Sequence, residues 1–173
     1  MSKSNRPLAA IILAAGQGTR MKSDTHKVLH PIAGKPMLHH LLDTVDGLGV
    51  ERTVVVVGAR REQIEASVAG RPVSVAVQYE QLGTGHAVAQ AKEALAGFAG
   101  DVLILYGDVP LVTEATMRAM VERLNAGDDP RAVVLAFRPD DAGAYGRVIA
   151  DERGLITKMV EFKDADDAER AVN

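Results

Sequence analysis

A group of glycine and basic residues follows the first apolar segment of the chain. Residues 8–15 are apolar without interruption, and Gly16, Gly18, Arg20 and Lys27 come soon after them. A short unbroken apolar run is typical of a strand buried on both faces of a parallel sheet. Glycines let the backbone turn sharply near a ligand, and free N–H groups beside two cations suit a polyphosphate. The pattern therefore predicts phosphate binding where this strand ends.

The spacing of the glycines excludes two common phosphate loops. A dinucleotide-binding fingerprint would place a third glycine where Met21 stands, and no Gly-Lys-Ser/Thr run of the Walker A type occurs. Because residues 14–16 are small, we expect the backbone itself to wrap the phosphates. An ordinary turn with exposed basic residues would also explain the glycines, and it is Arg20 and Lys27 that favour phosphate.

A second loop with glycines spans residues 78–86 and leads into a helical pattern. Its two glutamines, Gln78 and Gln81, each carry a donor and an acceptor, which can match the edge of a pyrimidine. A polar surface turn explains these residues equally well when they are considered alone.

Asp108 follows the apolar residues 102–106, at the kind of place where open α/β sheets bind ligands. A single carboxylate there suits Mg²⁺, which takes one or two carboxylates together with phosphate oxygens and waters. An aspartate that begins a turn before Pro110 is the alternative. The two phosphate-type loops elsewhere favour the metal.

Alternating strand and helix patterns connect these residues. The expected strands are residues 8–15, 53–57, 73–77, 102–106 and 132–137, and the expected helices are residues 35–48, 60–68, 86–95 and 113–124. This alternation predicts an α/β fold with a doubly wound, mostly parallel sheet. Residues 145–149 and 155–161 flank a turn with a glycine, which predicts an antiparallel hairpin insertion. Residues 164–173 favour a helix.

Length and composition limit the classes of function. The chain has 173 residues, 47% of them hydrophobic, which indicates a single domain with a real core. A net charge of −3 and 3% aromatic residues give no footprint for nucleic acid or for a membrane surface. The first apolar run is far shorter than the roughly 20 residues of a membrane helix. With no cysteine to indicate an oxidising compartment, we expect a cytoplasmic protein.

Five separated motifs resemble those of the sugar-nucleotide pyrophosphorylases. They are similar above all to the uridyltransferase domain of bacterial bifunctional enzymes that join N-acetylglucosamine-1-phosphate uridyltransferase to glucosamine-1-phosphate N-acetyltransferase. The resemblance covers essentially the whole chain, in order. The motifs are Leu13-Ala14-Ala15-Gly16-x-Gly18-Thr19-Arg20-Met21 with Lys27, Gln81-Leu82-Gly83-Thr84-Gly85-His86-Ala87, Tyr106-Gly107-Asp108-Val109-Pro110-Leu111, Tyr145-Gly146-Arg147, and Glu161-x-Lys163-Asp164-Ala165.

The resemblance implies a role for each matching position. Arg20 and Lys27 would be the catalytic cations, Asp108 would ligate Mg²⁺, and Gly146 with Glu161 would bind the amino sugar. The nucleotide would be held by Leu13, Ala14, Ala15, Gly16, Gly18, Lys27, Gln78, Gln81, Gly83, Thr84, Tyr106, Gly107 and Asp108.

The implied reaction joins UTP and N-acetylglucosamine 1-phosphate to form UDP-N-acetylglucosamine, a cell-wall precursor, and pyrophosphate. The alternatives are a pyrophosphorylase of other specificity, such as a glucose-1-phosphate or molybdopterin nucleotidyltransferase, and a nucleotide-binding fragment without turnover. In the family the domain continues, with a sugar-contacting Asn, a metal-ligating Asn and a trimeric β-helix. We therefore expect residues 1–173 to be one incomplete nucleotidyltransferase domain, monomeric and without the acetyltransferase part.

Overall fold

The computed structural model describes residues 6–16, 18, 21–127 and 130–172. It divides into two compact units, residues 1–131 and residues 132–173. That residues 1–173 form one domain remains a prediction. Among the helices described, none is both long and apolar enough to cross a bilayer.

The first unit is built on a four-stranded parallel sheet in the order β5-β4-β1-β6. Its strands are β1 (Leu8–Ala14), β4 (Arg52–Val57), β5 (Ser74–Val77) and β6 (Asp101–Tyr106). β1 lies in the middle, where Ala9 pairs with Arg52 on one side and Leu8 pairs with Asp101 on the other. Because all four strands run in one direction, their carboxyl ends meet at one edge of the sheet. The predicted parallel sheet is confirmed.

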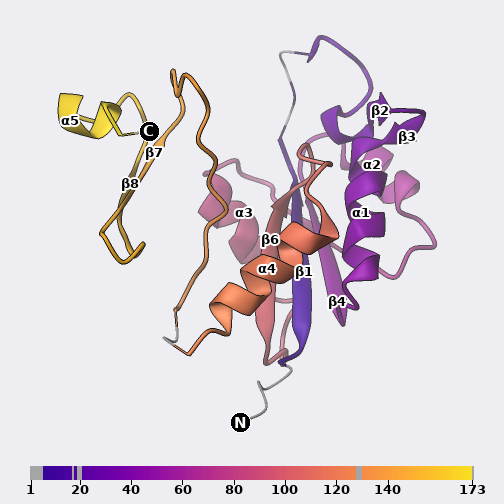
Figure 1. Ribbon diagram of the computed structural model, residues 1–173. Helices are drawn as coiled ribbons and strands as arrows, with labels where there is room; N and C mark the ends of the chain where they lie inside the picture. The colour runs from indigo at the N-terminus through magenta and orange to yellow at the C-terminus, as the bar shows by residue number, and fades with distance from the viewer. Residues whose placement is uncertain (1–5, 17, 19–20, 128–129, 173) are drawn as a thin grey trace. The chain divides into compact units, whose positions relative to one another are not determined.

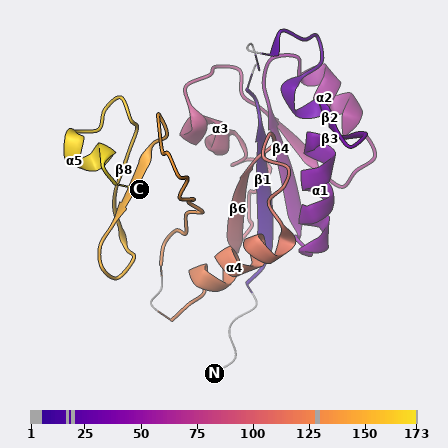
Figure 2. The same cartoon turned by 45° about the horizontal axis from the view of Figure 1, so that its top comes forward.

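Alternate side chains of β1 divide the core into two layers. Ile12 lies among the buried residues of α1, α2 and α4, whereas Ile11 and Leu13 lie with those of α3. The helices are α1 (Met37–Gly47), α2 (Arg61–Ser67), α3 (Thr84–Gln90) and α4 (Glu114–Leu124). The sheet is thus covered on both faces, which confirms the doubly wound arrangement (Figures 1 and 2).

Some element boundaries differ from the prediction. α1 begins after Pro36, because Pro36 pairs with Pro31 in a two-residue ladder between β2 (Pro31–Ile32) and β3 (Lys35–Pro36). α3 begins at Thr84, earlier than expected, because Gly83 adopts a φ of 100° and turns the chain into the helix. Thr113 caps α4, since its side chain accepts a hydrogen bond from the N–H of Thr116.

The second unit contains the predicted hairpin, formed by β7 (Arg147–Ala150) and β8 (Ile156–Val160), and the short helix α5 (Asp167–Arg170). The strand predicted at residues 132–137 is wrong, because this segment is irregular and pairs with no described strand. Its apolar side chains are exposed, 53% for Leu135 and 66% for Phe137. β-Branched and aromatic residues favour a strand only where a neighbouring strand satisfies their backbone groups.

Candidate active site

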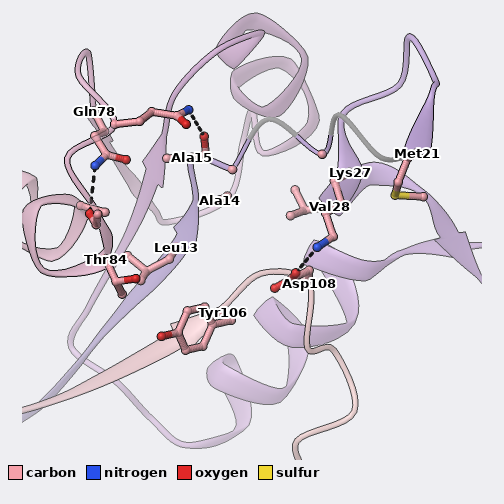
Figure 3. Close-up of a pocket in the computed structure, with 15 residues that line it drawn as sticks. Leu13, Ala14, Ala15, Met21, Lys27, Val28, Gln78, Thr84, Tyr106 and Asp108 are labelled. Carbon is pink, nitrogen blue, oxygen red and sulfur yellow. Dashed lines mark hydrogen bonds and ion pairs between the residues drawn. The ribbon is translucent and has the colours of Figure 1, made fainter. Parts of the chain in front are cut away.

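A cavity of about 620 Å³ lies in the first unit at the carboxyl edge of the sheet (Figure 3). Its volume is within the range of roughly 300–1,000 Å³ that is usual for small-molecule sites. The residues that line it come from the end of β1, the end of β6 and the turn after it, the loop before α3, the start of α3, and the segment around Lys27. They are Leu13, Ala14, Ala15, Gly16, Gly18, Met21, Lys27, Val28, Gln78, Gln81, Gly83, Thr84, Ala87, Tyr106 and Asp108.

The first wall is the end of β1, which two neighbouring turns hold in place. The N–H of Gly107 donates to the carbonyl oxygen of Leu13 at 2.9 Å. A Cβ on Gly58 would lie 2.7 Å from the carbonyl oxygen of Ala15, so only glycine fits there. Gly107, which was predicted to bind the nucleotide, is not among the residues that line the cavity and contacts Leu13 instead. Through this hydrogen bond Gly107 holds the end of β1 in position.

The second wall is the loop before α3, and its two glutamines are already engaged. Gln78 is 6% exposed, and its amide nitrogen donates to the carbonyl oxygen of Gly83 at 3.2 Å and lies 3.1 Å from Nδ1 of His86. The amide nitrogen of Gln81 donates to the carbonyl oxygen of Ala15 at 3.0 Å, which ties the second wall to the first. Because the nitrogen of Gln78 is used inside the loop, its carbonyl oxygen is the atom available to a ligand.

The predicted cation and the predicted carboxylate meet at the edge of the cavity. Lys27 begins the 3₁₀ helix η2 (Lys27–Leu29), Asp108 follows β6, and Nζ of Lys27 forms an ion pair with Oδ2 of Asp108 (Figure 3). Both side chains are about one-third exposed, 34% and 31%, so substrates can reach them. In this ion pair the charges of Lys27 and Asp108 neutralise each other. A metal-bound polyphosphate would separate the two side chains, because its phosphates would attract Lys27 and its cation would attract Asp108.

Asp108 fits the role of a ligand to a nucleotide-borne Mg²⁺. Over the described ranges, no group of three or more His, Asp or Glu side chains is arranged to hold a metal. A cage made only of protein ligands is therefore not formed by these residues. Mg²⁺ is instead commonly held by one or two carboxylates with substrate phosphates.

Arg20 is outside the described residues. Gly146 and Glu161 are neighbours in the second unit, where a Cβ on Gly146 would lie 3.7 Å from Oε2 of Glu161. Three lining residues, Met21, Val28 and Ala87, had no predicted role. Two of them stand inside the motifs, and Val28 adjoins Lys27, so proximity along the chain could have indicated them.

His26, which precedes Lys27, is buried. It is 1% exposed, and its Nδ1 accepts a hydrogen bond from the N–H of Val28 at 3.4 Å. Burial, and then the positive charge of Arg60, lower the pKa of His26. Burial, followed by the charge of Arg71, also lowers the pKa of His39.

These histidines predict a loss of stability in mild acid. A histidine whose pKa is lowered by folding binds its proton more readily when unfolded, so its contribution is complete above the ordinary value of 6.5 and is lost as pH falls below it. We expect the free energy of unfolding, measured in urea, to decrease between pH 7 and pH 5.5. His26→Asn should make this decrease smaller, because Asn Oδ1 can accept the same N–H without titrating. An unchanged slope in that variant would contradict the assignment to His26.

Together, a glycine-containing loop after a central parallel strand, a lysine–carboxylate pair and a polar loop before a helix describe a nucleotidyltransferase. The chain belongs to the MobA-like NTP transferase domain family, whose sequence model matches residues 10–172. Among curated relatives it is 64% identical, over 170 residues, to the bifunctional protein GlmU of Rhizorhabdus wittichii. It is 54% identical to GlmU of Zymomonas mobilis over 171 residues. Each alignment covers 98% of this chain and 38% of the relative.

Solved structures show the same fold. HddC from Yersinia pseudotuberculosis, complexed with GMP-PN, superposes with a TM-score of 0.66 at 26% identity, covering 88% of this chain and 68% of that one. A 4-diphosphocytidyl-2C-methyl-D-erythritol synthase from Anaerococcus prevotii gives a TM-score of 0.63 at 19% identity, covering 91% of this chain and 66% of that one. The latter likeness concerns the fold alone.

Proposed function

We propose that this chain transfers a uridylyl group from UTP to N-acetylglucosamine 1-phosphate, which yields UDP-N-acetylglucosamine and pyrophosphate. The observation that carries the proposal is the pairing of Lys27 with Asp108 in the cavity that also contains the end of β1 and the Gln78 loop. Identity of 64% to a GlmU protein supports the choice of substrates. In a cell, the product would be a cytoplasmic precursor of the cell wall.

The chemistry requires positioning and charge neutralisation. The phosphate oxygen of the sugar phosphate, already ionised, attacks the α-phosphorus of UTP in line. The bond from that phosphorus to the bridging oxygen breaks, and pyrophosphate leaves with the electron pair. A Ser, Cys or His nucleophile is not needed for this step. When bound, Mg²⁺ would supply Lewis-acid charge next to Asp108 and the phosphate oxygens.

Lys27 has the central role among the described residues. In the free protein its ammonium group is paired with Asp108, and in the complex it would turn to the negative charge that develops on the leaving pyrophosphate. Arg20 would share this task. The end of β1 offers backbone N–H groups and small side chains, which allow phosphates to approach closely.

The base and the sugar would be recognised in different places. The carbonyl oxygen of Gln78 would accept the N3–H of uracil, since its nitrogen is used by Gly83 and His86. Gly146 and Glu161 would hold the amino sugar. Because the HddC neighbour was solved with GMP-PN, a guanine nucleotide is the competing candidate for the base.

The proposal is tested by measuring pyrophosphate release from UTP, N-acetylglucosamine 1-phosphate and Mg²⁺, together with the thermal shift that UTP and Mg²⁺ produce. We expect release with UTP, little with GTP or CTP, and less when glucose 1-phosphate replaces the amino sugar. A thermal shift without release would identify a nucleotide-binding module instead. Preferential turnover of GTP, or of glucose 1-phosphate, would assign the chain to another pyrophosphorylase specificity.

A further inference from the structure

The segment that precedes Lys27 is held by the side chains of Gln63 on α2 and of Arg60, the residue just before α2. The carbonyl oxygen of the Gln63 amide accepts the N–H of His26 at 2.7 Å, and its nitrogen donates to the carbonyl oxygen of Asp24 at 2.8 Å. Nη1 of Arg60 donates to the carbonyl oxygens of Ser23 at 2.8 Å and Asp24 at 3.3 Å. Two side chains therefore make four hydrogen bonds to three backbone groups in residues 23–26, immediately before Lys27.

The segment has little regular structure that could fix Lys27 without this help. Within residues 22–30, all of which the structure describes, the regular element is η2, with three residues, and the N-cap of η2 is His26 itself. His26 is 1% exposed, and a Cβ on Gly107 would lie 3.2 Å from Cγ1 of Val28, so both neighbours of Lys27 are tightly packed. The direction of the Lys27 side chain therefore depends on where residues 23–26 are held.

Backbone strain marks the turn that carries Arg60. Arg60 has a φ of 57° and a ψ of 32°, the left-handed conformation that glycine adopts far more easily than arginine. Such conformations persist where the surroundings demand them, and they concentrate at functional sites. The same turn contains Gly58, which packs against Ala15, so one connection touches both the phosphate loop and the Lys27 segment.

We propose that Gln63 and Arg60 are positioning residues that act through Lys27. Neither lines the cavity, and both hold the backbone that aims the ammonium group of Lys27 at the phosphates. This role rests on the proposed nucleotidyl transfer. It differs from general support of the fold because its whole effect passes through one side chain.

A double-mutant cycle with Lys27 tests the proposal. Gln63→Leu, which removes both bonds at similar volume, should lower kcat by roughly 10- to 100-fold in the native chain, the effect of a small misplacement of a catalytic group. In the Lys27→Ala background the same change should have no further effect. Glu62→Gln is the matched control, since this neighbour on α2 has a side chain that is 77% exposed, and its kcat should be unchanged. Equal losses in both backgrounds would overturn the proposal.

Arg60→Gly separates positioning from folding. Glycine adopts the observed φ without strain, so the melting temperature should stay the same or rise, while the loss of the bonds to residues 23 and 24 lowers kcat. A variant with native kcat would overturn the role of Arg60. If Gln63→Leu does not fold, this variant and its combination with Lys27→Ala decide the question.

The affinity for Mg²⁺ and inorganic triphosphate, measured by calorimetry, keeps this inference apart from the proposed reaction. If the chain binds triphosphate but transfers no nucleotidyl group, the proposed function is wrong, and the double-mutant cycle is then measured as triphosphate affinity. If the chain is active but the effects of Gln63→Leu and Lys27→Ala on kcat are additive, only the positioning role is wrong. If the chain shows no triphosphate binding and no activity, both proposals are wrong.

Discussion

Lys27→Ala is expected to lower nucleotidyl transfer by roughly 100- to 1,000-fold, or about 3 kcal/mol of transition-state stabilisation, the loss typical for a charged or polar donor in a closed site. The reason is that, in the proposed reaction, the ammonium group would meet charge that grows on the leaving pyrophosphate, whereas the Gln78 loop would bind the base. The affinity for uridine nucleotides should therefore decrease much less than kcat. Pyrophosphate release and calorimetric titration with UTP measure the two quantities separately.

A second measurement on Lys27→Ala should change in the opposite direction. Removing the lysine frees Asp108 from its ion pair, so Mn²⁺ binding without nucleotide, followed by electron paramagnetic resonance, should become several-fold tighter. Lys35→Ala is the control, because Lys35 is a surface lysine that pairs with Asp43 on α1. Native turnover in Lys27→Ala would refute the catalytic assignment.

Asp108→Asn is expected to reduce activity far more than stability. The amide keeps the shape of the carboxylate and loses the negative charge that holds a hard cation. Its ion pair with Lys27 is partly exposed, and such pairs contribute only about 0–1 kcal/mol to folding. The melting temperature should thus stay near that of the native chain, while kcat falls by roughly 100-fold or more at any Mg²⁺ concentration.

The matched control is Asp46→Asn. Asp46 is a surface carboxylate on α1 that forms an ion pair with Arg71. The substitution should leave turnover unchanged. Native activity of Asp108→Asn at saturating Mg²⁺ would remove Asp108 from the metal site. A large fall in melting temperature would instead give Asp108 a structural role.

The sequence predicts the sheet well because each of its strands has a strong local signal. The apolar run of β1 and the valines of β4 belong to strands buried on both faces, and parallel order then places their carboxyl ends together. Asp108 and the glycines near position 16 could be placed at one edge for this reason. Residue types at these positions suggested phosphate for the glycine loop and a metal for Asp108, and the resemblance to a known family added the individual nucleotide-binding and sugar-binding roles.

Contacts between distant segments could not be predicted in the same way. Gln63 bonds to His26 across 37 positions of the chain, and no periodicity points from one to the other. The strand predicted at residues 132–137 was wrong for a related reason. The composition of these residues favours a strand, but a strand also needs a neighbouring strand to pair with. The hydrogen bond from Gly107 to Leu13 could not be predicted either, because it forms only when β1 and β6 are adjacent in the sheet.

The central place of β1 affects how the site comes into existence during folding. Its register with β6 brings Leu8 against Asp101, so the end of β1 and Asp108 come to the same edge of the sheet only after a long chain loop has closed. Such non-local pairing slows folding and leaves intermediates without a complete cavity. A nucleotide that binds only the assembled sheet would stabilise the folded state by mass action and would protect the chain against proteolysis. The substrate pool of the cell would then set how much of this chain persists, in addition to how fast it works.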